Sequence, residues 1–298
     1  MKIQTPKTTY QGHRGARGLA PENTIISAIE ALQHGVQGLE FDVVLTGENQ
    51  FLLSHEPYFS HEFCSKPNGE AILRKEKLHH NIYRMDYETI KKYDCGKRGH
   101  LRYPEQQPIL AIKPLLKTFF EEIEKYVLEN KLEKPFYTLE IKSDLAWYGF
   151  MQPLPAEMVR LFIKEITNYS FYDAIKDRLM IESFDINILN ELYRQTQNTQ
   201  TKFEIGFLVE NKFSLEENLS KLEFVPDVYV PYYRLLTKKK IQQLQQMGIK
   251  VFTWTVNDTK KMQQLQNWGV DSIITDFPNR IPQRAEKKLQ SSITTAER

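Results

Sequence analysis

Residues 9–45 read TYQGHRGARGLAPENTIISAIEALQHGVQGLEFDVVL, and this stretch decides the fold. Two short segments within it, Thr9–His13 and Gly38–Leu45, combine β-branched or aromatic residues with nearby glycines, which is typical of strands. The segment between them, Glu22–His34, has a helical pattern of apolar residues, and Gly35 follows where a left-handed residue commonly ends a helix. A strand, a helix and a second strand in this order predict two parallel strands joined by a helical crossover.

The same unit recurs along the chain. Further strands are predicted at Gln50–His55, Phe136–Lys142, Leu179–Phe184, Glu204–Val209, Asp227–Pro231, Lys250–Val256 and Asp271–Thr275. Further helices are predicted at Lys113–Glu129, Ala156–Tyr169, Ile186–Thr196, Thr237–Met247 and Thr259–Trp268. Seven or eight such units in about 270 residues favour an α/β fold, the closed TIM (β/α)8 barrel, over a doubly wound open sheet. Because the strands outnumber the barrel positions, we expect Gln50–His55 to pair with Gly38–Leu45 in a hairpin that leaves the barrel.

The composition excludes several classes of protein. The 298 residues include 40 Lys and Arg against 38 Asp and Glu, a formal net charge of +2, which excludes a nucleic-acid partner held by a generally basic surface. Apolar residues make up 41% of the chain, but the absence of any run of about 18 of them excludes a membrane-spanning helix. The first twelve residues carry no secretory signal, so we expect a cytoplasmic protein, or a periplasmic or secreted one if a leader has been removed.

Residues 56–107 interrupt the repeating pattern. They are dense in charged residues, Tyr, Gly and Pro, and we expect them to form a small subdomain inserted after the second barrel strand, in a single catalytic domain ordered over about residues 8–283. Both cysteines of the chain, Cys64 and Cys95, lie here, too few for a disulfide scaffold or a four-cysteine zinc site. They form either one disulfide or two unpaired thiols, and the sequence leaves both open. Residues 284–298 are a polar tail that we expect to fray.

Three acidic residues in two of the predicted strands are candidate metal ligands. Glu40 and Asp42 are two residues apart, so both carboxylates point to the same face. Glu140 and Lys142 have the same spacing in a later strand. The alternatives are solvated acids for the first pair and a plain internal salt bridge for the second. Inside a barrel mouth, however, grouped carboxylates need a cation between them, and three oxygen ligands suit one Mg²⁺ or Ca²⁺ rather than zinc.

Histidines and cationic residues also lie at the ends of predicted strands. His13 and Arg14 end the first strand and His55 ends the hairpin, although a structural or exposed side chain is the alternative for each. The carboxyl ends of the strands meet at one mouth of a (β/α)8 barrel, so we expect these residues around one site, with Trp254 as a wall. Two histidines, a metal, Arg14 and Lys142 together suggest cleavage of a phosphate ester, because developing negative charge needs clustered positive donors.

Short motifs in a fixed order span nearly the whole chain, from about Tyr10 to Arg280. They are His13-Arg14-Gly15, Pro21-Glu22-Asn23-Thr24, Glu40-Phe41-Asp42, His55, Leu139-Glu140-Ile141-Lys142, Ser183-Phe184-Asp185, Trp254-Thr255-Val256-Asn257 and Ile274-Thr275-Asp276-Phe277-Pro278. In this order they resemble the glycerophosphodiester phosphodiesterase family. The resemblance implies a TIM barrel with a small insertion after the second strand. It also implies an enzyme that uses Mg²⁺ or Ca²⁺ to split a small glycerophosphodiester substrate into sn-glycerol 3-phosphate and an alcohol.

The resemblance also implies a role for each site residue. Glu40, Asp42 and Glu140 match the metal ligands, His13 and His55 the acid/base histidines, Arg14 and Lys142 the phosphate-binding residues, and Trp254 the residue that lines the alcohol side. We expect His13 to be the base and His55 the acid. The family commonly has Asp where this chain has Glu56, which affects only the fine positioning of His55. Two other functions stay open: a lysophospholipase D-like enzyme that acts on acylated lipids, and a barrel that binds a phosphorylated ligand without cleaving it.

Overall fold

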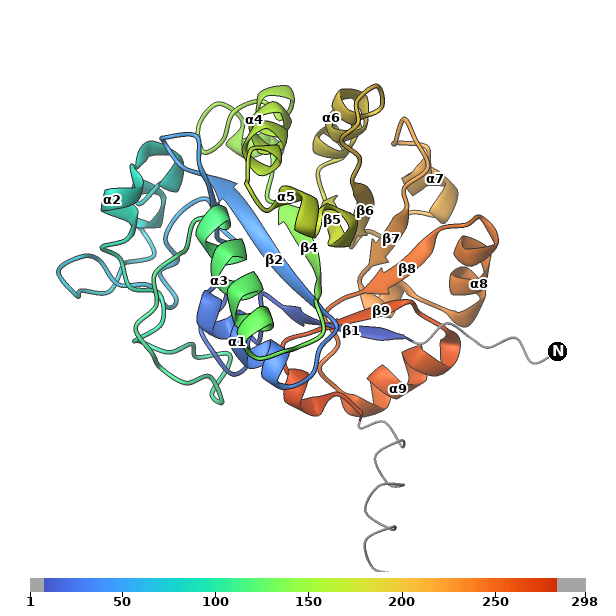
Figure 1. Cartoon of the computed structure of the whole chain (residues 1–298), viewed down its shortest axis with the longest axis horizontal. Coiled ribbons are helices and arrows are strands. Elements are labelled where there is room, and N and C mark those ends of the chain that lie inside the picture. The colour runs from blue at the N-terminus through green and yellow to red at the C-terminus, as the bar shows by residue number, and fades with distance from the viewer. Residues whose placement is uncertain (1–7, 283–298) are drawn as a thin grey trace, which may run out of the picture.

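A closed barrel of parallel strands forms the centre of the molecule (Figure 1). The computed structural model describes residues 8–282. The strands follow the order β1-β9-β8-β7-β6-β5-β4-β2, and pairing of β1 with β2 closes the ring. This confirms the TIM barrel and excludes the open sheet. The strands are β1 (Thr9–His13), β2 (Gly38–Leu45), β3 (Phe51–Leu53), β4 (Phe136–Ile141), β5 (Leu179–Ser183), β6 (Glu204–Val209), β7 (Val228–Pro231), β8 (Lys250–Thr253) and β9 (Ser272–Thr275).

Among the described strands, the short strand β3 pairs with β2 alone and runs antiparallel to it, so it lies outside the ring. The predicted hairpin is therefore confirmed. Val43 lies opposite Leu53 and Leu45 opposite Phe51 in this pairing. All four side chains are buried, which fixes the register because a slip of one residue would turn them to the other face.

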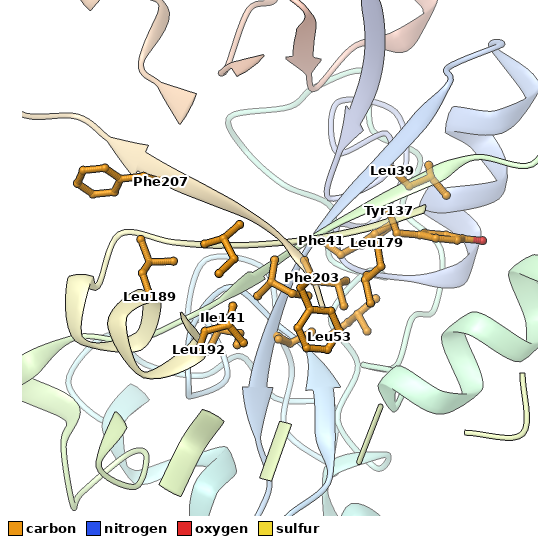
Figure 2. Close-up of a cluster of buried hydrophobic side chains, with 14 of the residues drawn as sticks. Leu39, Phe41, Leu53, Tyr137, Ile141, Leu179, Leu189, Leu192, Phe203 and Phe207 are labelled. Carbon is orange, nitrogen blue, oxygen red and sulfur yellow. The ribbon is translucent and has the colours of Figure 1, made fainter. Parts of the chain in front are cut away.

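Helices surround the strands (Figure 1), and an apolar layer fills the space between helices and barrel. Figure 2 shows part of this layer, with Leu39 and Phe41 of β2, Ile141 of β4 and Leu192 in one cluster. The rings of Phe41 and Phe119 lie 4.5 Å apart, and truncating such a buried ring to Ala typically costs about 3–5 kcal/mol. The helices are α1 (Ile25–Gln33), α2 (Tyr87–Ile90), α3 (Leu116–Glu129), α4 (Pro155–Thr167), α5 (Tyr172–Ile175), α6 (Ile186–Thr196), α7 (Leu215–Leu219), α8 (Lys238–Gln246) and α9 (Thr259–Trp268).

Helix α1 begins at Ile25, three residues later than the pattern predicts. The physical reason is the cap: Thr24 is extended, and its hydroxyl accepts a hydrogen bond from the backbone N–H of Ser27. Asn23 has a φ of 55°, a left-handed conformation that no helix interior permits. The two residues before the cap, Glu22 and Asn23, are thereby left free to turn toward the barrel mouth.

The segment 56–107 contributes a small apolar cluster of its own. Phe59, Ile82 and Ile90 are fully buried in it, against Leu52 of the hairpin. Cys64 and Cys95 lie in the same cluster and are joined by a disulfide, so of the two open possibilities the structure has the bonded one. The separate subdomain stays a prediction, and the polar tail at 284–298 lies outside the described residues. Within residues 8–282 no helix is long and apolar enough to span a membrane.

Candidate active site

The carboxyl ends of β1, β2 and β4 bring the predicted acidic residues together. His13 is paired with Glu40 in the register of β1 and β2, and Asp42 is paired with Glu140 in that of β2 and β4. One oxygen from each of the three carboxylates lies within 4.8 Å of the other two. All three side chains are buried, and those of Glu40 and Glu140 line a cavity of about 140 Å³ together with His13 and His55.

The three carboxylates fit a bound cation. Burial and the neighbouring Asp42 charge raise the pKa of Glu40 well above its usual value, and burial raises the pKa of Glu140 to about 7 despite the nearby Lys142 ammonium. Burial alone would also raise the pKa of Asp42, but the Arg14 guanidinium holds it well below its usual range. Among the described residues, the buried Oδ1 of Asp42 has no hydrogen-bond partner. A hard divalent cation would relieve this repulsion and take up the unused oxygen.

His13 is held in place by the carboxylate of Asp276, the residue that follows the last barrel strand. Its Nδ1 lies 2.6 Å from Oδ1 of Asp276, so we assign the proton to Nδ1, which leaves the lone pair on Nε2. That Nε2 lies 3.8 Å from Oε2 of Glu40. Burial, followed by the Arg17 charge, lowers the pKa of His13 to about 4. The ring is therefore neutral at neutral pH and can accept a proton.

Asp276 is itself fixed by donors from three parts of the chain. Arg17 donates through Nε at 2.9 Å to Oδ1, and Asn257 donates through Nδ2 at 2.8 Å to Oδ2. Tyr103, from the inserted segment, donates at 3.4 Å to Oδ2, and its ring lies 4.8 Å below the Arg17 guanidinium. Sequence reasoning missed Arg17 and Tyr103, and it quoted Asp276 without giving it a role. The available signal was an arginine only four positions after His13.

His55 has a similar arrangement. Its Nδ1 lies 2.9 Å from Oε1 of Glu56. Burial would raise the pKa of Glu56, but the hydrogen bond with His55 and the charges of His55, Arg14 and Lys113 together lower it to about 2. The longer side chain at position 56 therefore still reaches the histidine. Burial, and then the Arg14 charge, lowers the pKa of His55. The buried Lys113, whose pKa burial lowers, adds a positive charge near Glu56 that the sequence reading also missed.

Both predicted phosphate-binding cations are paired with carboxylates. Arg14 donates through Nη1 to Glu22 at 2.8 Å, and its Nε lies 3.1 Å from Oδ2 of Asp42. Lys142 donates to Glu140 at 2.7 Å, so the salt bridge weighed as an alternative is present, at the mouth itself. Asn23 donates to Oδ2 of Asp42 at 2.9 Å, which is why the turn before α1 matters to the site.

The other wall of the cavity is largely apolar. Trp254 lies in it, with its ring 5.4 Å from that of Phe184 and its Nε1 donating to the carbonyl of Val230 at 3.0 Å. Leu208 also lines this wall. One further acid, Glu182 of β5, lines the same cavity and was missed, although an ionisable residue between apolar neighbours in a predicted strand was the signal. Burial, then the Glu40 charge, raises the pKa of Glu182 well above its usual value.

Residues 13–280 match the model of the glycerophosphoryl diester phosphodiesterase family. The chain belongs to this family. It is therefore a phosphoric diester hydrolase, as the motifs indicated, and every predicted site residue falls within the matched range.

Individual relatives agree with this assignment. The chain is 27% identical over 276 residues to a glycerophosphodiester phosphodiesterase of Caldanaerobacter subterraneus, covering 91% of this chain and 95% of that protein. A crystal structure of a putative glycerophosphoryl diester phosphodiesterase from Silicibacter pomeroyi is 26% identical, with a TM-score of 0.77 over 92% of each chain. An Oleispira antarctica phosphodiesterase, solved with the product sn-glycerol-3-phosphate, is 22% identical, with a TM-score of 0.68 over 96% of this chain and 97% of that one.

Proposed function

We propose that the protein hydrolyses glycerophosphodiesters to sn-glycerol 3-phosphate and an alcohol, by a metal-dependent mechanism with two histidines. One observation carries the proposal: His13 and His55, each tied through Nδ1 to a carboxylate, line one cavity beside three clustered acids. Family membership supports the substrate class, and so does the product bound to the Oleispira antarctica relative.

In this mechanism the three clustered acids would bind the cation. Glu40, Asp42 and Glu140 would hold one Mg²⁺ or Ca²⁺, since both ions prefer carboxylate oxygens. Such a cation, when bound, supplies positive charge to a non-bridging phosphate oxygen. Arg14 and Lys142 lie beside the same acids and would hold the rest of the phosphate charge through ionic hydrogen bonds.

The histidines move the protons. His13, neutral and with Nε2 free, takes a proton from the nucleophile, which is either water or the substrate's own 2-hydroxyl. His55, in its doubly protonated form, gives the proton on Nε2 to the departing alkoxide, and the Glu56 carboxylate at Nδ1 favours that form against the effect of burial. Each such transfer is typically worth about 10²–10⁴ in rate. Trp254 lies on the wall that would face the alcohol half.

Turnover of glycerophosphocholine, followed by the enzymatic detection of released sn-glycerol 3-phosphate, tests the proposal. We expect release in the presence of Mg²⁺ or Ca²⁺. A barrel that only binds phosphorylated ligands would release nothing, and release of glycerol with phosphocholine would show cleavage of the wrong ester bond. Either result would contradict the proposal.

The loop after β4 favours one second candidate, a lysophospholipase D-like activity on acylated lipids. Leu145, Phe150 and Leu154 are between half and three-quarters exposed on this loop, which starts at the barrel mouth next to Lys142. Exposed apolar side chains beside a site are typical of contact with an apolar ligand or surface. Comparison of kcat/KM for lysophosphatidylcholine and glycerophosphocholine separates the two functions.

A further inference from the structure

Glu182 has the features of an unused ligand group. Its side chain is 1% exposed, and Oε2 is buried without a hydrogen-bond partner among the described residues. It lines the same cavity as the two histidines. A buried carboxyl group without a partner costs free energy, so one that is kept inside a binding cavity points to a ligand that satisfies it.

The neighbouring strand makes room for this carboxyl group. Gly206 of β6 lies opposite Glu182 in the strand register. A Cβ atom at position 206 would lie 3.1 Å from Cβ of Glu182 and 3.3 Å from its Oε2. Any larger residue there would press on the side chain, so the glycine leaves space for it.

Glu182 is also distinct from the cation cluster. Within residues 8–282, only Glu40, Asp42 and Glu140 offer ligand atoms that all lie within 4.8 Å of one another. Glu182 instead lies next to Glu140 in the register of β4 and β5, and it lines the cavity together with Leu208 and Phe184. A group that binds there meets apolar carbon surface and a single unpaired carboxyl group.

We infer that Glu182 recognises the glycerol half of the substrate, by accepting a hydrogen bond from a glycerol hydroxyl group. This rests on the proposed function, which sets the phosphate at the cation cluster, in the cavity that Glu182 also lines. The carbons of glycerol pack against the apolar side chains, and the hydroxyl satisfies Oε2 of Glu182. Sites that hydrogen-bond a substrate hydroxyl select strongly against analogues that lack it, because the buried partner is then left unpaired.

Binding of two phosphate monoesters to the cation-loaded full chain tests this inference. The first is sn-glycerol 3-phosphate, and the second is n-propyl phosphate, which has the same carbon chain without hydroxyls. Isothermal titration gives both dissociation constants with no need for turnover. We expect the wild type to prefer the glycerol ester by at least about 10-fold, and Glu182→Leu to lose most of that preference while Glu182→Gln keeps a part of it. The matched control is Met180→Leu, on the same strand, which should leave the preference unchanged.

Two results would overturn the inference alone: equal affinities in the wild type, or an undiminished preference in folded Glu182→Leu. Failure of the wild type to bind either ester would refute the proposed function as well. If Glu182→Leu does not fold, Gly206→Ala replaces it, since the new Cβ displaces the carboxyl group. A folded Gly206→Ala protein with the full preference would equally overturn the inference.

Discussion

The Nδ1 atom of His13 lies 2.6 Å from Oδ1 of Asp276, although 263 positions separate the two residues in the chain. The contact joins the end of the first barrel strand to the residue that follows the last one. Closure of the ring by pairing of β1 with β9 and β2 makes it possible. It ties the geometry of the proposed base to the integrity of the whole barrel.

Asp276→Asn should lower kcat by at least about 10²-fold, because an amide that donates to Nδ1 would leave the proton on Nε2 and remove the acceptor. Steady-state turnover of glycerophosphocholine measures the effect. Asp173→Asn, at an exposed residue that forms a surface ion pair with Lys176, is the control and should stay within about twofold of the wild type. Normal turnover in Asp276→Asn would show that this carboxylate does not set the tautomer of His13.

His13→Ala and His55→Ala should each lower kcat by about 10²–10⁴-fold with little change in melting temperature. The reason is that each removes one proton transfer. His34→Ala is the matched control, since His34 does not line the cavity and its side chain pairs with Glu30 on α1. If either cavity variant keeps near-normal turnover, the two-histidine scheme is wrong.

Removal of divalent cations with EDTA should abolish turnover, and Mg²⁺ or Ca²⁺ should restore it. The same cation should raise the melting temperature, because it neutralises three buried carboxylates that repel one another. Glu140→Gln should weaken that thermal shift, and differential scanning calorimetry measures it. Turnover that resists the chelator would contradict the metal assignment.

Glu165, which lies outside the active site, should make the stability of the fold depend on pH. Burial raises its pKa, although it accepts hydrogen bonds from Tyr169 and from the backbone N–H of Phe51. A raised pKa in the folded state means that the stability contributed by the protonated group is lost as pH rises through that pKa. Relative to Glu165→Gln, the wild type should therefore lose free energy of unfolding as the pH rises above about 4.3, the ordinary pKa of Glu, and through the raised pKa of the folded state.

Urea unfolding at several pH values measures this difference. The exposed Glu129→Gln variant serves as the control and should show no such trend relative to the wild type. A constant difference between wild type and Glu165→Gln across the range would mean that Glu165 does not titrate differently in the folded chain.

The disulfide between Cys64 and Cys95 should stabilise the inserted segment by restricting the unfolded chain. Replacement of both residues by Ser should lower the free energy of unfolding by about 2–4 kcal/mol. Dithiothreitol should destabilise the wild type by a similar amount and leave the double variant unaffected. Insensitivity of the wild type to the reductant would argue against the bond.

The strand and helix pattern was readable in the sequence because it depends on local spacing. Alternation in Gly38–Leu45 sets which side chains face the helices, and the residue range predicted for that strand is the one observed. The same alternation put Glu40 and Asp42 on one face. The convergence of strand ends in a barrel then grouped them with Glu140.

Other parts of the site depended on contacts that local pattern does not encode. The side chains of Arg17, Tyr103 and Asp276 meet because the inserted segment lies over the place where β1 and β9 pair and close the barrel. In the sequence, Glu182 is one acid in an otherwise apolar strand. The closed barrel places it opposite Gly206 and beside the acidic cluster. Periodicity fixes the direction of a side chain relative to its own strand. Only the closure of the barrel determines which distant side chain it meets, because that depends on register and curvature summed over all eight strands.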